Sequence, residues 1–113
     1  MAKVSLQFHT DLKEYKKDLA NVVRLKFNRL RKRYDEILSA TVNLDKGEKD
    51  DTPYQLKSTV ILKTKLKNFV ATKVEKMPLK AIRESFDAAE RQIRKYLDKI
   101  SHRWEKHNNG KLH

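Results

Sequence analysis

The sequence has no cysteine, only two glycines and two prolines among 113 residues, and a single tryptophan. Without cysteine the protein has no disulfide, no zinc–thiolate site and no thiol nucleophile. The scarcity of glycine and proline, together with periodic apolar residues, argues against intrinsic disorder. No apolar run approaches the roughly 20 residues that span a bilayer. Residues 1–5 lack the apolar stretch of a signal peptide, so we expect a cytoplasmic protein.

Positive charge is what the sequence has in excess, with 27 Lys and Arg against 15 Asp and Glu and a formal net charge of +12. Two segments carry most of this excess. Residues 10–34 hold nine basic and three acidic side chains, residues 76–106 hold nine and five, and residues 35–75 hold seven of each. Positive charge concentrated on two segments creates an electric field with a direction. Such a field favours binding to a polyanion, either nucleic acid or an anionic membrane. A membrane is the weaker candidate, because the apolar stripes of these segments are needed for a core.

The apolar residues alternate in four places, which predicts strands over residues 4–8, 40–44, 54–62 and 69–74. Between and after them, spacings of three and four predict helices from about residue 12 to 34 and from about residue 78 to 104. Asp11 and Glu14 form a capping-box pattern for the first helix, and Pro78 suits the first turn of the second. Aromatic residues on the stripes are expected to pack in the core: Tyr15, Phe86, Tyr96 and Trp104.

The element order β-α-β-β-β-α predicts an α+β two-layer sandwich, a four-stranded sheet with both helices on one face. The first two strands should be parallel with a right-handed crossover, and the last three should form a meander. Residues 1–104 should form a single domain, and residues 105–113 a flexible polar tail. Residues 45–53 read as a solvated loop, because lysines interrupt the acids that a calcium loop would need.

The helical geometry also predicts where the basic side chains point. On the first helix a cationic row lies beside the apolar stripe and consists of Lys13, Lys17, Arg24 and Arg31. On the second helix the basic residues lie on the solvent side. Along each row the charges are roughly 5 to 11 Å apart, which is commensurate with phosphates of a nucleic acid strand. We expect the two rows to flank a shared basic groove. The candidate RNA-binding residues are Lys13, Lys17, Arg24, Arg31, Lys80, Arg83, Arg91, Arg94, Lys95 and Lys99.

Signals for catalysis, metals and cofactors are poor. The four histidines form no i,i+4 ligand pair, and neither an HExxH nor a P-loop pattern occurs. A small enzyme would have to rely on Asp87 and Asp98, the two acids on the basic side of the second helix. We therefore expect a binding protein that is not an enzyme, with no cofactor, no metal and no small-molecule substrate.

Three stretches resemble the family of ribosome hibernation-promoting factors and ribosome-associated inhibitors, also described as ribosomal subunit interface proteins. Residues 30–40 are similar to the family's "L-x-K-x-F/Y-D-x-I-x-x-A", and residues 90–95 to its "L-E-R-Q-L-R-K". Ala81-Ile82 is the third match, near the start of the last helix. The resemblance covers residues 4–103 and is to a short form, without the C-terminal dimerisation domain of long members. Met77-Pro78-Leu79 stands where the family often has an acidic residue and a tyrosine.

The resemblance implies the same β-α-β-β-β-α fold and a function. Family members bind the small ribosomal subunit in the channel for messenger and transfer RNA, contact ribosomal RNA through both helices, and preserve idle ribosomes in stationary phase or stress. This implies a translation inhibitor that is a monomer off the ribosome, without a membrane partner. By position, the resemblance assigns RNA contacts to Lys17, Arg24, Arg31, Arg91, Arg94, Lys95 and Lys99.

A general double-stranded RNA-binding module is the alternative, since it too has two helices on one face of an antiparallel sheet. Its lysine cluster at a helix N-terminus is weak in this sequence, where Lys76 and Lys80 flank Met77-Pro78.

Overall fold

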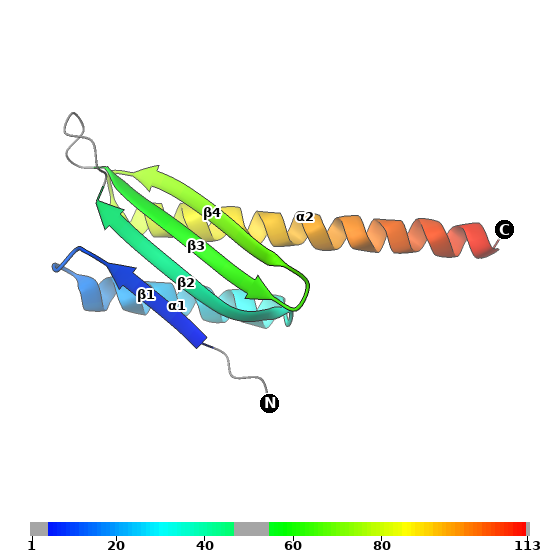
Figure 1. The fold of residues 1–113 in the computed structure, drawn as a ribbon, viewed down its shortest axis with the longest axis horizontal. Helices are drawn as coiled ribbons and strands as arrows, with labels where there is room; N and C mark the ends of the chain where they lie inside the picture. The colour runs from blue at the N-terminus through cyan, green and yellow to red at the C-terminus, as the bar shows by residue number, and fades with distance from the viewer. Residues whose placement is uncertain (1–4, 47–54, 113) are drawn as a thin grey trace.

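The computed structural model describes residues 5–46 and 55–112, with side chains described as far as Ser101. It confirms the predicted α+β fold and element order (Figure 1). The elements are β1 (Ser5–Thr10), α1 (Lys16–Arg33), β2 (Ile37–Lys46), β3 (Leu56–Thr64), β4 (Asn68–Glu75) and α2 (Pro78–Leu112).

The four strands form one sheet in the order β1-β2-β3-β4. The parallel pairing of β1 with β2 is confirmed, with Leu6 opposite Ala40 and Phe8 opposite Val42. The other two pairings are antiparallel, so the predicted meander is also confirmed. A two-residue connection would suffice for an antiparallel pair, whereas the parallel pair needs the crossover that α1 provides.

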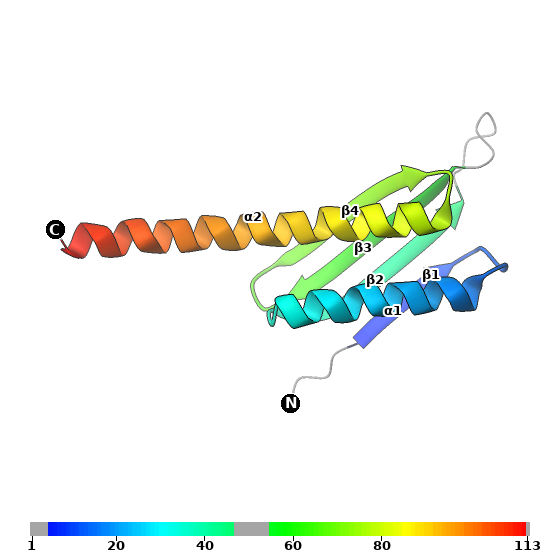
Figure 2. The ribbon, with the colours of Figure 1, turned by 180° about the vertical axis from the view of Figure 1, so that it is seen from behind.

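Both helices cover the same face of this sheet and start at the same end of it, as the two opposite views show (Figures 1 and 2). Apolar side chains from β2, β3 and β4 alternate toward the helices, and the stripes of α1 and α2 meet them. Val23, Val42, Val60 and Ile82 are fully buried at the centre of this single core. The other sheet face is uncovered, so alternation separates a core face from a solvent face.

One pair of hydroxyl groups lies inside this apolar core. Ser58 of β3 and Ser85 of α2 are both fully buried, with 2.8 Å between their Oγ atoms. Ser85 donates its proton to the carbonyl of Ile82 at 2.9 Å, which leaves Ser58 as the donor between the two hydroxyls. The pair thus joins the first half of α2 to the central sheet by a satisfied polar contact.

The predicted capping box at Asp11 and Glu14 is wrong. The amide of Leu12 donates to the Thr10 hydroxyl at 3.1 Å, while Asp11 accepts from the backbone amide of Lys46 at 3.3 Å. These contacts hold the chain in a turn beyond β1, and α1 begins only at Lys16. Tyr15 is the N-cap, with φ 62° and ψ 15° and no side-chain cap hydrogen bond.

The core prediction for Tyr15 is also wrong, because its side chain is 69% exposed. On α2 the predicted stripe is buried from Ile82 to Ile93, but its first residue, Leu79, and Ile100 near its end are exposed. Val4, Tyr54 and residues 47–53 lie outside the described residues, as does the side chain of Trp104. The helix runs to Leu112, and the flexibility expected of residues 105–113 stays a prediction.

Candidate nucleic-acid interface

All ten candidate RNA-binding side chains are exposed. Nine lie on the two helices, while Lys13 precedes the first residue of α1. Within the described part of the chain only Lys80 of this set forms an ion pair, with Glu75 at 3.4 Å. The remaining charges face solvent without a protein counter-ion there, which leaves them available to an external anion.

The cationic row of α1 lies on the side of the helix next to β1. Arg24 and Arg31 line a hollow together with Leu6 and Phe8 of β1 and with Phe27. Arg24 and Arg31 therefore do not face a groove shared with the second helix, as was expected for this row. They instead border a separate depression between α1 and the edge of the sheet.

The groove between the helices has other basic residues, which the sequence analysis missed. Lys26, Arg29 and Arg33 of α1 line a hollow there together with Asp87 and Glu90 of α2. These three basic residues recur at the helical spacings of three and four, on the flank of the apolar stripe opposite Arg24 and Arg31. That spacing was a signal that could have found them.

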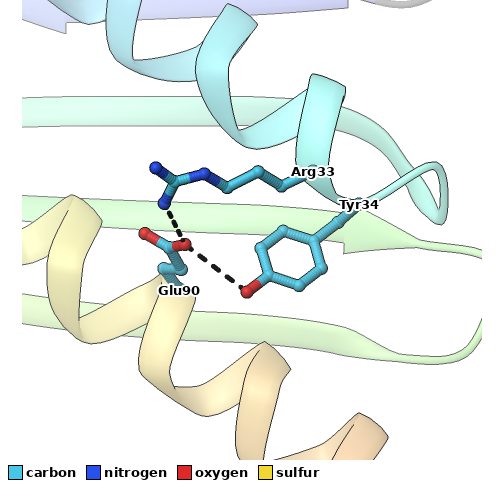
Figure 3. A network of polar contacts seen from close by, with 3 residues as sticks. All are labelled: Arg33, Tyr34 and Glu90. Carbon is cyan, nitrogen blue, oxygen red and sulfur yellow. Dashed lines mark hydrogen bonds and ion pairs between the residues drawn. The ribbon is translucent and has the colours of Figure 1, made fainter.

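One acidic residue of α2 neutralises part of the positive charge in this interhelical groove (Figure 3). Arg33 Nη1 lies 2.8 Å from Glu90 Oε2, and the Tyr34 hydroxyl donates to the same oxygen at 3.4 Å. The hydrogen bond to Glu90, and then its charge, raise the pKa of Arg33. Burial is the main cause that raises the pKa of Tyr34, and the charge of Glu90 adds to it. Glu90 thus clamps the end of α1 to the middle of α2.

The second helix carries its basic side chains away from the sheet, as predicted. Arg83, Arg91, Arg94, Lys95 and Lys99 are all exposed, whereas Ile93, between them in sequence, is 1% exposed. Gln92 lies on the β4 side, where its amide donates to the carbonyl of Val70 at 2.8 Å. The basic side chains of α2 therefore lie on its solvent-exposed surface.

Charge is distributed very unequally between the helices and the uncovered sheet face. Residues 16–33 of α1 contain eight basic and one acidic side chain. On β3 only Lys57 and Lys63 are basic on the uncovered face, among threonines and Ile61. Polyanion binding is therefore favoured on the helix side of the molecule.

Aromatic rings at the far end of the sheet serve packing. Phe69 and Tyr96 meet edge to face with 5.7 Å between ring centroids, and Lys67 Nζ lies 5.4 Å and 5.3 Å from the two centroids. Phe86 is 1% exposed, so its predicted core role is confirmed.

Among the described residues no three His, Cys, Asp or Glu side chains gather into a possible metal site. None of the helices in that part of the chain is long and apolar enough to cross a membrane.

Comparison with known proteins decides the family of this basic two-layer fold. A family model described as Sigma 54 modulation protein / S30EA ribosomal protein matches residues 6–101. The chain belongs to this family. The match extends from β1 into α2, and it confirms the resemblance to ribosomal subunit interface proteins that the sequence predicted. No curated protein matches the sequence.

Two solved structures share the S30EA fold seen here. A ribosomal subunit interface protein from Coxiella burnetii is 15% identical and has a TM-score of 0.70, with 83% of this chain and 98% of that chain covered. The N-terminal domain of Protein Y from Thermus thermophilus is 20% identical and has a TM-score of 0.65, with 85% and 99% covered. At these identities the likeness shows the fold, and the S30EA family gives a ribosome-associated class of proteins rather than an enzyme class.

Proposed function

We propose that this protein is a ribosome-binding translation inhibitor. In this proposal it occupies the channel for messenger and transfer RNA on the small ribosomal subunit, and it preserves idle ribosomes during stationary phase or stress. It acts in the cytoplasm and is a monomer off the ribosome. Membership of the S30EA family supports the ribosome as partner.

The observation that carries the proposal is the set of exposed, largely unpaired basic side chains on one side of the fold. A protein that neutralises several phosphates gains affinity by releasing counter-ions, without reading base sequence. Ribosomal RNA offers such phosphates on the walls of the channel. The proposed contacts are the ten candidate residues, Lys13, Lys17, Arg24, Arg31, Lys80, Arg83, Arg91, Arg94, Lys95 and Lys99, to which the structure adds Lys26 and Arg29.

The geometry disfavours the alternative, a general double-stranded RNA-binding module. Such a module concentrates lysines at the start of its second helix, whereas Lys80 is here engaged by Glu75. The basic side chains instead continue along α2 to Lys99 and on both flanks of α1. A long basic face suits an enclosing RNA surface better than one short duplex.

The test compares binding to purified small subunits with binding to naked duplex RNA of equal length. We expect tight binding to the subunit, with displacement of messenger and initiator transfer RNA. Changing Arg91, Arg94 and Lys95 together to Gln should weaken subunit binding about 50- to 150-fold at 0.15 M salt, if three phosphate contacts are lost. Undiminished binding of messenger and transfer RNA beside the protein would contradict occlusion. Equal affinity for naked duplex would favour the alternative.

A further inference from the structure

An exposed apolar hollow lies at the end of the molecule where both helices begin. It is lined by Leu12, Tyr15, Leu56 and Pro78, with Lys46, Lys76 and Glu14 around them. Leu56 is buried, Leu12 and Pro78 are half-buried, and Tyr15 is 69% exposed. None of the ten candidate RNA-binding residues lines this hollow.

Tyr15 has no evident role in the fold. Its ring is 69% exposed and, among the described residues, makes no ring contact, and its hydroxyl makes no hydrogen bond. Its backbone nevertheless adopts the left-handed conformation, with φ 62°, which a bulky side chain disfavours. Glycine or asparagine would meet this backbone requirement more easily. An aromatic residue that is mostly exposed and does not suit its backbone conformation points to a contact outside the chain.

The charges around the hollow indicate what that contact is. Lys46 and Lys76 border it against a single acid, Glu14, and Lys16 and Lys17 follow Tyr15 in the first turn of α1. A flat ring beside apolar surface and flanked by cations suits an unpaired nucleobase, whose face stacks while its phosphates meet the lysines. A protein partner fits less well, since lysine is depleted at the centres of protein interfaces.

We infer that this hollow binds one unpaired RNA base, stacked on the Tyr15 ring, with the adjoining phosphates against Lys46 and Lys76. The inference rests on the proposed function, because the base belongs to the ribosomal RNA that the helices contact. It adds a stacking contact to an interface otherwise made of charges. Stacking tolerates any base, so the site places the strand without reading its sequence.

The experiment uses the full chain with three substitutions. Tyr15→Asn removes the ring and keeps a residue that tolerates the left-handed backbone, and Tyr15→Phe keeps the ring. Leu66→Asn is the matched control, because Leu66 is an exposed apolar residue, 48% accessible, in the turn between β3 and β4. Each protein is titrated onto purified small subunits and onto single-stranded oligouridine at several salt concentrations, and its thermal melt is recorded.

Tyr15→Asn should weaken binding to both RNAs about 5- to 150-fold, the range for losing one stacked base, with an unchanged salt slope because no charge is lost. Tyr15→Phe and Leu66→Asn should bind like the unchanged protein, and Tyr15→Asn should melt no lower. If the unchanged protein binds subunits and Tyr15→Asn binds equally well, the stacking site is refuted while the function stands. A lower melting temperature for Tyr15→Asn would make the ring structural and would also overturn the inference. If the unchanged protein fails to bind subunits, the proposed function itself fails.

Discussion

The flank of α1 next to β1 gives the sharpest test of the RNA-binding surface. Arg24 and Arg31 are exposed, lack an ion pair within the described residues and line one hollow. Replacing both by Gln keeps helix propensity nearly constant. If each contacts one phosphate, the slope of log affinity against log salt should become shallower by about 1.4 to 1.8. At 0.15 M salt that slope change corresponds to roughly 15- to 30-fold weaker binding.

A matched pair on the opposite side of the molecule controls for net charge. Lys57→Gln with Lys63→Gln removes the same two charges from the uncovered sheet face. Both double variants are titrated onto small subunits across a salt series, with thermal melts in parallel. We expect the α1 variant to lose affinity and slope, the β3 variant to change little, and both to stay within about ±0.5 kcal/mol per surface site in stability. Equal losses in the two variants would mean that affinity follows net charge alone, and the assignment of the helix side would then be refuted.

Three further outcomes concern the fold and its polar clamps. Ile93→Ala, at a site 1% exposed, should lower the unfolding free energy by about 2 to 5 kcal/mol in a denaturant titration, and a loss below 1 kcal/mol would contradict its core position. Ser85→Ala should cost roughly 1 to 3 kcal/mol by stranding the buried Ser58 hydroxyl, whereas the double alanine variant should recover most of that loss in the same assay. The raised pKa of Tyr34 means that the folded state favours the neutral phenol. The resulting contribution to folding stability is fully present below the ordinary tyrosine pKa of about 10, and it is lost as the pH rises through the raised pKa. Between about pH 9 and 11 the protein should thus lose more stability than Tyr34→Phe, and Glu90→Gln should lower the pKa of Tyr34 in an ultraviolet titration.

The spacing of apolar residues was enough to predict the fold: alternation marks the strands, and spacings of three and four mark the helices. This works because a small two-layer protein has one core, and each strand or helix turns one face toward it. Val42 and Leu44 on β2, and Ile82 and Ile93 on α2, illustrate this, since all four are buried as predicted. The start of α1 was not predictable in this way. The Asp11 carboxylate matches a cap in local sequence, but its partner is the amide of Lys46, 35 positions away.

The candidate interface was predictable in composition but not in arrangement. A helical wheel gives the angle of Arg24 or Arg33 around the axis, but it does not say which flank faces the neighbouring helix. That depends on the handedness of the crossover and on the strand order, which are properties of the whole fold. The charge of Lys26 and Arg29 was visible in the sequence, but the acids opposite them, Asp87 and Glu90, become neighbours only in three dimensions.

The position of β1 at the edge of the sheet has a consequence for local opening. β1 has six residues and pairs with β2 alone, and its Leu6 and Phe8 are only half-buried. Detaching it breaks a single ladder and leaves the β2-β3-β4 meander with α2 intact, so its amides should exchange with solvent earlier than those of β3. The hollow bordered by Arg24 and Arg31 has this strand as one wall. This hollow therefore belongs to the part of the fold that opens most easily. Under the proposed function, the α1 flank adapts to an irregular RNA surface while α2 holds its position.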